Sequence, residues 1–317
     1  MRNALRARFV LGDIAVEVSG GGPDLHAQME AIWGLCVAEN APHLPIAATC
    51  KVQVRSLAKG RYRLLRSFGL GSARGTARLD VQGSDLLASL EGLVYAACDN
   101  ASVLTSVHAG AVVAETGPLL FLGASNAGKS SLVCAGLDAG ACFVSDDRCL
   151  TDGQRLFGVP RTPRFNPTRG GEALPERLRA LDHHSYTLRL QASEGVFHAH
   201  VPLRPVPRSQ VWSEPLLLAD MTLVLLSTAT TPSRLWPVTS APLKAELLRG
   251  VCGTGMFARA LCEQPLYLCH WSDPSEAYAQ LLAAEHKRIS AAPSHAPRCS
   301  RNDASRVGHA AHVGQRL

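Results

Sequence analysis

Three stretches near the start of the chain alternate apolar and polar residues with a period of two. They are residues 13–18, 51–55 and 78–82. This period is typical of β-strands that place one face on a core and the other in water. Glycine-rich breaks at residues 20–22 and 69–75, and one helix over residues 25–37, are expected between the strands. The pattern therefore predicts a β-rich N-terminal region over residues 1–104.

The pattern then changes to that of a helix followed by a compact α/β unit. Apolar residues at helical spacing predict a helix over residues 84–98, with Ser84 as its N-cap. Two short apolar strands, a glycine loop, a helix and another strand follow. Their predicted bounds are residues 111–114, 119–122, 129–138 and 141–145, with a turn at Thr116-Gly117 and a helix stop at Gly140. A strand–loop–helix–strand order is typical of α/β folds.

The rest of the chain has a mixed pattern and then loses its apolar period. Strands are expected over residues 187–190, 196–201 and 223–226, and helices over residues 242–249, 251–262 and 274–287. From residue 288 onward, alanine, serine, proline, histidine and arginine predominate. We therefore expect an N-terminal region (1–104), a core (105–287) and a basic, disordered tail (288–317).

Composition and charge exclude several classes of protein. Of the 317 residues, 46% are hydrophobic and 18% are charged, which allows a buried core and argues against wholesale disorder. The net charge of +6 is concentrated in the last 32 residues, where six basic residues face one aspartate. The body therefore lacks the global cationic field that nucleic-acid binding favours. No apolar run reaches the length of about 18 residues that is typical of a membrane span.

Cysteine usage indicates a reducing compartment. Ten cysteines are present, none forms a C-x-x-C pair, and several lie inside apolar runs where a small hydrophobic residue would also fit. Reduced thiols in a cytoplasmic protein are the expected state. The N-terminal segment does not have the pattern of a secretory signal.

One glycine-rich motif carries the clearest chemistry. Residues 119–131 read LLFLGASNAGKSS, in which Gly123 and Gly128-Lys129-Ser130 satisfy G-x-x-x-x-G-K-[ST], the P-loop of nucleotide-binding proteins. The predicted strand before the loop and the helix after it supply the context that a chance glycine turn lacks. Glycine permits backbone dihedrals and a close approach that a Cβ would block.

The expected ligand of this loop is a nucleoside triphosphate with Mg²⁺. Backbone amides of the loop and the positive N-terminus of the helix can point at phosphate oxygens. Lys129 would bridge the β- and γ-phosphates, and the Ser130 hydroxyl would reach Mg²⁺. The expected nucleotide-binding residues are Gly123, Ser125, Asn126, Ala127, Gly128, Lys129, Ser130 and Ser131.

A pair of carboxylates forms the second chemical signal. Asp146 and Asp147 come directly after the strand that is predicted to return beside the P-loop helix. One carboxylate can hold Mg²⁺ together with Ser130, and the other can accept a proton from an attacking hydroxyl. Because successive strand residues face opposite sides, only a bend after Val144 lets both carboxylates point at the site. A plain polar turn is the alternative interpretation.

These residues resemble the HPr kinase/phosphorylase family, whose kinase domain shares a fold with phosphoenolpyruvate carboxykinase. The resemblance runs from residues 107–110 through the P-loop to residues 145–147, and the offset from Lys129 to Asp146 looks like that of the family. The N-K-x-D motif of GTPases and the L-S-G-G-Q motif of ABC ATPases do not occur in the sequence. The resemblance implies an α/β fold with a PEP carboxykinase/HPr kinase-like P-loop core.

The resemblance also implies roles for single residues. Asp146 would be the general base that takes the proton of a serine hydroxyl, and Asp147 would assist Mg²⁺ together with Ser130. His108 matches a family histidine near the phosphates, although a structural histidine would fit the position equally well. Lys129 would act on the transferring phosphate.

The resemblance extends to two arginines, and the sequence also departs from the family pattern in places. Arg161 and Arg164 lie where related kinases have a Pro-Arg-Pro segment, and they could bind phosphate or an acidic substrate. The glycine-rich signature that follows the carboxylates in the family is not recognisable, and residues 1–100 do not look like the N-terminal domain of the HPr enzyme. The chain looks closer to HPr-kinase-related proteins, some of which phosphorylate a serine on a precursor peptide, including lasso peptides.

The sequence therefore predicts a cytoplasmic, Mg²⁺- and ATP-dependent kinase that phosphorylates a serine on a peptide or small protein. No membrane or nucleic-acid partner is expected, and a homo-oligomer is implied only by the resemblance. ATP rather than GTP follows from the resemblance and from the missing guanine motif. Two alternatives stay open, a kinase of a small hydroxyl metabolite and a nucleotide-gated binding module that catalyses nothing. The acceptor, any reverse phosphorolysis and the role of the tail also stay open.

Overall fold

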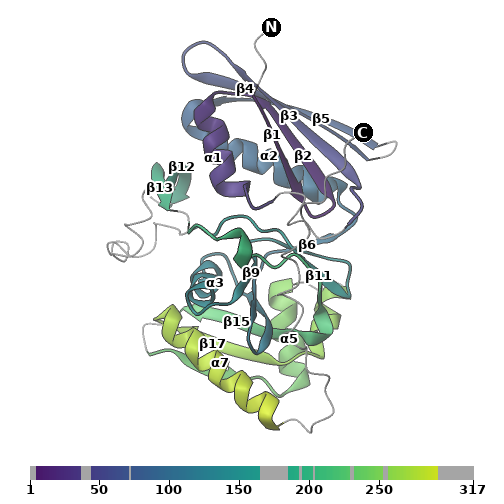
Figure 1. The fold of residues 1–317 in the computed structure, drawn as a ribbon, viewed down its shortest axis with the longest axis vertical. Helices are drawn as coiled ribbons and strands as arrows, with labels where there is room; N and C mark the ends of the chain where they lie inside the picture. The colour runs from purple at the N-terminus through teal and green to yellow at the C-terminus, as the bar shows by residue number, and fades with distance from the viewer. Residues whose placement is uncertain are drawn as a thin grey trace, which may run out of the picture.

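The computed structural model describes residues 5–36, 44–70, 73–164, 185–192, 195–202, 204–228, 232–252 and 256–291. Helices and strands are mixed along the chain, as the α/β prediction requires, and they form several sheets. Figure 1 shows a five-stranded sheet at one end of the molecule and a six-stranded sheet toward the other. Among the described residues, no helix combines the length and the apolar character needed to span a bilayer.

The N-terminal region is an open sheet covered by helices. Its strands, in their spatial order, are β1 (Arg6–Leu11), β2 (Ile14–Gly20), β3 (Ala48–Ser56), β4 (Arg61–Leu70) and β5 (Ala73–Gln82). The helices are α1 (Pro23–Trp33) and α2 (Leu86–Ala101), the latter after a 3₁₀ turn over Gly83–Asp85. Only β2 and β3 pair in parallel, because α1 connects them as a crossover, and the other neighbours are antiparallel. The alternating apolar residues pack against α1 and α2 in one core.

The six-stranded sheet carries the P-loop. Its order is β16 (Arg234–Pro237), β17 (Leu266–Trp271), β15 (Thr222–Thr228), β8 (Gly117–Leu122), β7 (Gly110–Ala114) and β9 (Cys142–Ser145). The strands β8, β15 and β17 are parallel, so their carboxyl ends meet at one edge. Ligands of open α/β sheets bind at such an edge.

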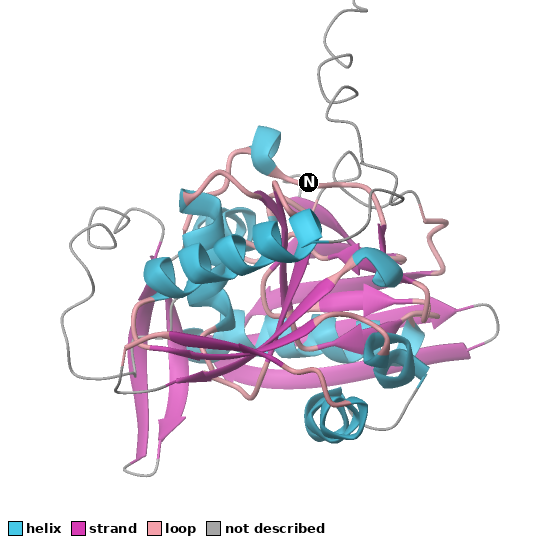
Figure 2. Cartoon of the chain, turned by 90° about the horizontal axis from the view of Figure 1, so that it is seen from below, coloured by secondary structure: helices cyan, strands magenta, loops and turns pink. Residues whose placement is uncertain are grey.

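Helices cover both faces of this sheet, which Figure 2 shows from below. They are α3 (Lys129–Asp138) and α7 (Pro274–Ala291) on one face, and α5 (Ala241–Cys252) and α6 (Met256–Cys262) on the other. Neighbouring strand residues alternate between the two cores, so that Phe121 packs with α3 and Leu120 packs with α6. A sheet buried on both faces explains why its strands read as continuous apolar runs.

A small sheet joins the two larger ones. Its order is β14 (Leu216–Leu217), β11 (Arg155–Gly158), β10 (Cys149–Thr151) and β6 (Thr105–Val107). Leu150 and Phe157 from this sheet, and Val159 after it, belong to the core of the N-terminal region. The remaining described elements are the hairpin of β12 (Ser185–Ala192) and β13 (Gly195–Pro202) and the 3₁₀ turns Arg208–Gln210 and Leu218–Asp220.

Most of the predicted elements are present, but several predictions are wrong in detail. The helix expected over residues 25–37 ends earlier, at Trp33, because the chain turns at Gly34. Ser84 does not cap α2, because a 3₁₀ turn precedes the helix and Asp85 occupies the cap position. Residues 69–75 do not form a broad break, since Gly69 and Gly75 lie inside β4 and β5. The helix α7 continues through residue 291, beyond the expected start of the tail, and residues 292–317 lie outside the described residues.

Candidate functional site

The P-loop sequence forms the predicted connection between a strand and a helix. The strand β8 ends at Leu122 and α3 begins at Lys129, so residues 123–128 are the loop. Gly123 and Gly128 have positive φ angles of 149° and 100°, a region that favours glycine. A Cβ at Gly123 would lie 2.9 Å from the Ala127 Cβ and 3.0 Å from the Leu226 carbonyl oxygen. The two motif glycines are therefore required by the shape of the loop itself.

The C-terminal end of the loop is covered by Trp271, the last residue of β17. The Trp271 Nε1 donates a hydrogen bond of 2.8 Å to the Ala127 carbonyl oxygen. A Cβ at Gly128 would lie only 1.8 Å from Cζ2 of the Trp271 ring. The indole therefore rests directly on the glycine that precedes the lysine, a contact that the sequence does not predict because Trp271 and Ala127 are 144 positions apart.

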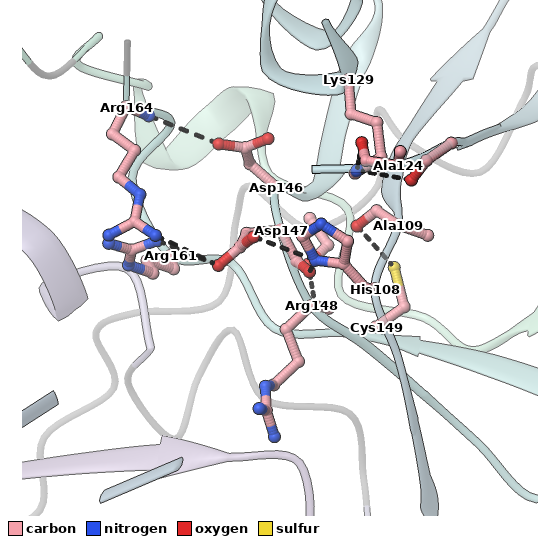
Figure 3. Close-up of polar contacts among 12 residues, drawn as sticks. His108, Ala109, Ala124, Lys129, Asp146, Asp147, Arg148, Cys149, Arg161 and Arg164 are labelled. Carbon is pink, nitrogen blue, oxygen red and sulfur yellow. Dashed lines mark hydrogen bonds and ion pairs between the residues drawn. The ribbon is translucent and has the colours of Figure 1, made fainter. Parts of the chain in front are cut away.

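Lys129 points into the loop. Its Nζ donates hydrogen bonds to the carbonyl oxygens of Gly123 and Ala124, each at 2.9 Å (Figure 3). Only 6% of the residue is exposed. Burial lowers the pKa of Lys129, and the charges of Asp147 and Asp146 oppose that shift. The ammonium group is thus held where the motif predicts the phosphates of a nucleotide.

Asp146 lies at the end of β9 and is buried. Its Oδ2 accepts a hydrogen bond of 3.3 Å from the backbone N–H of Arg164. Its Oδ1 is buried and makes no hydrogen bond of ordinary geometry within the described ranges. Burial raises the pKa of Asp146, and a nearby Ser130 hydroxyl partly lowers it. Ser130, which the sequence hypothesis paired with Asp147, therefore interacts with Asp146.

Asp147 turns to the other side of the same strand end. Its φ angle of 78° lies in the left-handed region, which non-glycine residues adopt rarely and mostly at functional sites. The predicted bend after Val144 is thus present, and it places the two carboxylates on different sides of the strand end. The Asp147 Oδ1 lies 3.1 Å from Nδ1 of His108, and the Asp147 carbonyl oxygen lies 2.9 Å from the same nitrogen. Figure 3 shows Asp146 and Asp147 pointing apart, with His108 beside the second carboxylate.

Two arginines bind the far oxygen of Asp147. Its Oδ2 lies 3.5 Å from both Nη1 of Arg161 and Nη2 of Arg164. Burial alone would raise the pKa of Asp147, but the hydrogen bond from His108 and the charges of Arg164 and Arg161 hold it well below its usual range. The two adjacent aspartates therefore differ in acidity, because one is buried with few partners and the other is surrounded by cations.

The arginines are anchored by a carboxylate that sequence reasoning missed. Glu91 of α2 lies 2.6 Å from Nη2 of Arg161 and 3.3 Å from Nη1 of Arg164. Arg161 is only 1% exposed, so it contacts carboxylates of the chain rather than solvent. The Arg164 side chain is 29% exposed. Of the two expected substrate contacts, only Arg164 is reachable from solvent in this structure.

The predicted site residues comprise the residues that form the P-loop and the side chains that could take part in the chemistry. Ser125 and Asn126 are exposed on the P-loop, while Ala127 is buried and Ser131 is partly buried in the first turn of α3. The chemical side chains that converge are Lys129, Ser130, Asp146, Asp147 and His108. A pocket of about 360 Å³ opens beside His108. Its lining includes Thr105, Ser106, Thr151, Val251 and Phe257.

The donor set fits a magnesium ion better than a transition metal. Within the described ranges, no three His, Cys, Asp or Glu side chains group closely enough to hold a metal ion. Mg²⁺ is normally bound through one or two carboxylates and the substrate phosphates, with water completing an octahedron. The buried Asp146 Oδ1 without a hydrogen-bond partner and the neighbouring Ser130 hydroxyl are oxygen donors of the kind that Mg²⁺ prefers.

Comparison with known proteins leaves the family undetermined. The sequence matches no protein-family model and no curated protein. One solved structure that it matches is the Hpr(Ser) kinase/phosphatase from Coxiella burnetii, at 13% sequence identity and a TM-score of 0.27. The match covers 59% of this chain and 98% of that chain. At this TM-score the match carries no argument, so the function proposed below rests on the motifs and on the geometry of the site.

Proposed function

We propose that this protein is a Mg²⁺- and ATP-dependent kinase that transfers the γ-phosphate to a serine hydroxyl of a peptide or small protein. The observation that carries the proposal is the P-loop geometry around Lys129, together with a neighbouring strand end that bears Asp146 and an Asp147 held by His108 and two arginines. A P-loop alone indicates phosphate binding. The adjacent carboxylates add the groups that phosphoryl transfer to a hydroxyl requires.

The P-loop side of the site binds the nucleotide. Backbone amides of residues 124–130 and the N-terminus of α3 face the phosphates, and Lys129 neutralises the charge of the β- and γ-phosphates. Ser130 and Asp146 would hold Mg²⁺, which supplies charge neutralisation of the phosphate oxygens. This assignment exchanges the two aspartates relative to the sequence hypothesis, because Ser130 interacts with Asp146.

The other side of the site receives the acceptor. The acceptor hydroxyl approaches Asp147 and His108 from the adjacent pocket. As the oxygen–phosphorus bond forms and the bond between the γ-phosphorus and the bridging oxygen breaks, the hydroxyl proton passes to the Asp147 carboxylate and ADP leaves. Because Asp147 is a weak base when paired with two arginines, its main contribution is to orient the hydroxyl, which suffices for a loose transition state.

The peptide class of acceptor rests on the resemblance to HPr kinase-like proteins described above. The size of the pocket is compatible with a short segment of polypeptide, because ligand pockets of about 300–1,000 Å³ bury ligands of drug size. The strand β6, which contributes to the lining, is the last strand of its sheet among the described residues. An edge strand can pair with an extended peptide, which favours a peptide acceptor over a small metabolite.

The test is phosphate transfer with matched carboxylate variants. The protein is incubated with γ-labelled ATP, Mg²⁺ and either peptides encoded beside its gene or a lysate of its source cells. Wild type should label a peptide or protein, whereas Asp146→Asn and Asp147→Asn should not. Asp138→Asn is the control, because that exposed carboxylate at the end of α3 pairs with Arg204, away from the site. Its labelling should equal that of wild type.

Three outcomes would contradict the proposal or the roles that it assigns. Nucleotide binding without transfer to any acceptor would support a nucleotide-gated binding module instead. A labelled product of low mass, without labelled peptide, would support a kinase of a small hydroxyl metabolite. Labelling that survives in both aspartate variants would remove the assigned roles of the carboxylates.

A further inference from the structure

Glu91 is a buried carboxylate that the motifs of the site do not include. It lies in the middle of α2, the second helix of the N-terminal region, and is 7% exposed. A buried charge is costly unless it is paired. Its partners are the guanidinium groups of Arg161, 2.6 Å away, and Arg164, 3.3 Å away. Both partners come from the segment that follows the catalytic carboxylates.

The same two arginines connect Glu91 to Asp147. Arg161 contacts Glu91 through Nη2 and Asp147 through Nη1, so one guanidinium bridges the two carboxylates. Arg164 does the same through Nη1 and Nη2. Two parallel bridges fix the position of Asp147 more firmly than one contact would, because a planar guanidinium presents its donors in a fixed fork.

The helix α2 supports the catalytic segment at further points. Arg148, the residue after Asp147, lies over the ring of Tyr95 of α2, 4.4 Å from its centroid. Val159 packs into the core of the N-terminal region. The turn that presents Asp146 and Asp147 is therefore built against α2.

We infer that Glu91 is a positioning residue for phosphoryl transfer, which holds Arg161 and Arg164 against Asp147 and so fixes where the acceptor hydroxyl is received. The inference rests on the proposed function. Glu91 belongs to α2 of the N-terminal region and lies outside the P-loop. The inference therefore assigns the N-terminal region a part in catalysis. Without the charge of Glu91, Arg161 and Arg164 lose one of the carboxylates that hold them in place. Their positions then change, and the orientation of Asp147, which both contact, changes with them.

The first measurement separates transfer from nucleotide binding. Glu91→Gln should lower kcat by about 10- to 100-fold, the usual effect of removing a group that orients a reacting side chain. The affinity for Mg·ATP should stay within about twofold, because the ion pairs of Glu91 are with Arg161 and Arg164 and not with Lys129 of the P-loop. Glu91→Asp keeps the charge and should restore part of the lost kcat.

The matched control is Asp99→Asn. Asp99 lies on the same helix and pairs with Arg148 of the same segment, but its side chain is 49% exposed, and an exposed ion pair contributes little. It should therefore transfer phosphate like wild type. Equal transfer by Glu91→Gln and wild type, or an equal loss in Asp99→Asn, would overturn the inference.

The second measurement does not depend on activity. Unfolding of wild type, Glu91→Gln, Asp147→Asn and the double variant forms a cycle. Because the two carboxylates share the arginines, their effects on the unfolding equilibrium constant should be coupled. The effect of the double variant should differ from the product of the two single effects by about threefold or more. The cycle of Asp99→Asn with Asp147→Asn should be multiplicative.

The two measurements distinguish failure of the positioning role of Glu91 from failure of the kinase proposal. Multiplicative effects of Glu91→Gln and Asp147→Asn would overturn the positioning role, even if wild type is an active kinase. Coupled unfolding in a protein that transfers no phosphate would leave the link between the carboxylates in place and remove the kinase proposal.

Discussion

Replacing Gly128 with alanine tests the contact between the P-loop and Trp271. The new Cβ would lie 1.8 Å from Cζ2, 2.4 Å from Cε2 and 2.8 Å from Nε1 of the indole, so the ring has to move. The ring is held by its hydrogen bond to Ala127 and belongs to the margin of a packed core, so it cannot yield freely. The φ angle of 100° adds backbone strain.

The expected cost can be worked from these three effects. A positive φ in a non-glycine residue costs about 1–2 kcal/mol. Displacing a packed ring costs about 1–3 kcal/mol, and losing its hydrogen bond about 1 kcal/mol more. Gly128→Ala should therefore lower the free energy of unfolding by about 3–6 kcal/mol if the effects add.

Gly140→Ala is the control for backbone strain alone. Gly140 has a φ angle of 88°, and a Cβ there would meet no atom within 4 Å. This variant should lose only about 1–2 kcal/mol. Denaturant unfolding of both variants, followed by circular dichroism, isolates the contribution of the indole as their difference.

A rescue variant completes the test. In a Trp271→Leu background the ring is gone, so adding Gly128→Ala should cost no more than Gly140→Ala does in wild type. The reasoning is refuted if Gly128→Ala and Gly140→Ala are equally destabilising in wild type. It is also refuted if the cost of Gly128→Ala is unchanged without the indole.

Three further predictions concern the charged groups of the site. Lys129→Ala should weaken ATP binding by about 30- to 150-fold, since hydrogen bonds to charged groups contribute about 2–3 kcal/mol, and an unchanged Kd from Trp fluorescence titration would contradict the P-loop assignment. The aspartates should respond oppositely to pH in the ligand-free protein. Asp147 has a lowered pKa and stabilises the fold above its unfolded pKa of about 4, so Asp147→Asn should cost about 3 kcal/mol at pH 7 and progressively less as the pH falls below that value. Asp146 has a raised pKa, and its stabilising effect exists below about pH 4 and is lost as the pH rises, so Asp146→Asn should make the ligand-free protein more stable than wild type at pH 7. Urea unfolding at a series of pH values measures both effects, and equal responses of the two variants would contradict the assigned environments. Ser130→Ala should reduce the Mg²⁺ dependence of ATP binding while leaving Mg²⁺-free binding within about twofold, which isothermal titration with and without Mg²⁺ measures.

The parts of the site that sequence predicts are those encoded by neighbouring residues. The P-loop follows from glycine spacing, because the positive φ angles at Gly123 and Gly128 are local requirements of the turn. The carboxylate pair is visible for the same reason. The sequence also predicts the need for a bend beside them, which the left-handed φ of Asp147 provides.

The parts that sequence misses depend on residues far apart in the chain. Glu91 reads as a polar residue on an amphipathic helix, and its partner Arg164 lies 73 positions later. Trp271 meets Ala127 across 144 positions. Neither contact leaves a local pattern, because both arise only when elements that are distant in the sequence come together in the fold.

The glycines of the N-terminal hairpin show how a local rule can mislead. The run over residues 69–75 suggests a wide break, yet Gly75 lies within β5, opposite Phe68 of β4. A Cβ at Gly75 would lie 2.1 Å from Cε1 of the Phe68 ring. The glycine makes room for a cross-strand aromatic ring, so it extends the strand instead of ending it.

The hydrogen bonds of Lys129 set a threshold for what can enter the P-loop. In the structure the ammonium already has two carbonyl acceptors from its own loop, each at 2.9 Å. A ligand replaces these hydrogen bonds only if its interaction with the Lys129 ammonium group is stronger than that of the two carbonyl oxygens. A polyphosphate chain does so, because its negatively charged oxygens add a direct Coulombic attraction to the ammonium group that neutral carbonyl oxygens lack. A neutral sugar or a lone hydroxyl compound does not. Because its own carbonyl oxygens already accept hydrogen bonds from Lys129, the loop favours highly charged ligands over weakly interacting ones.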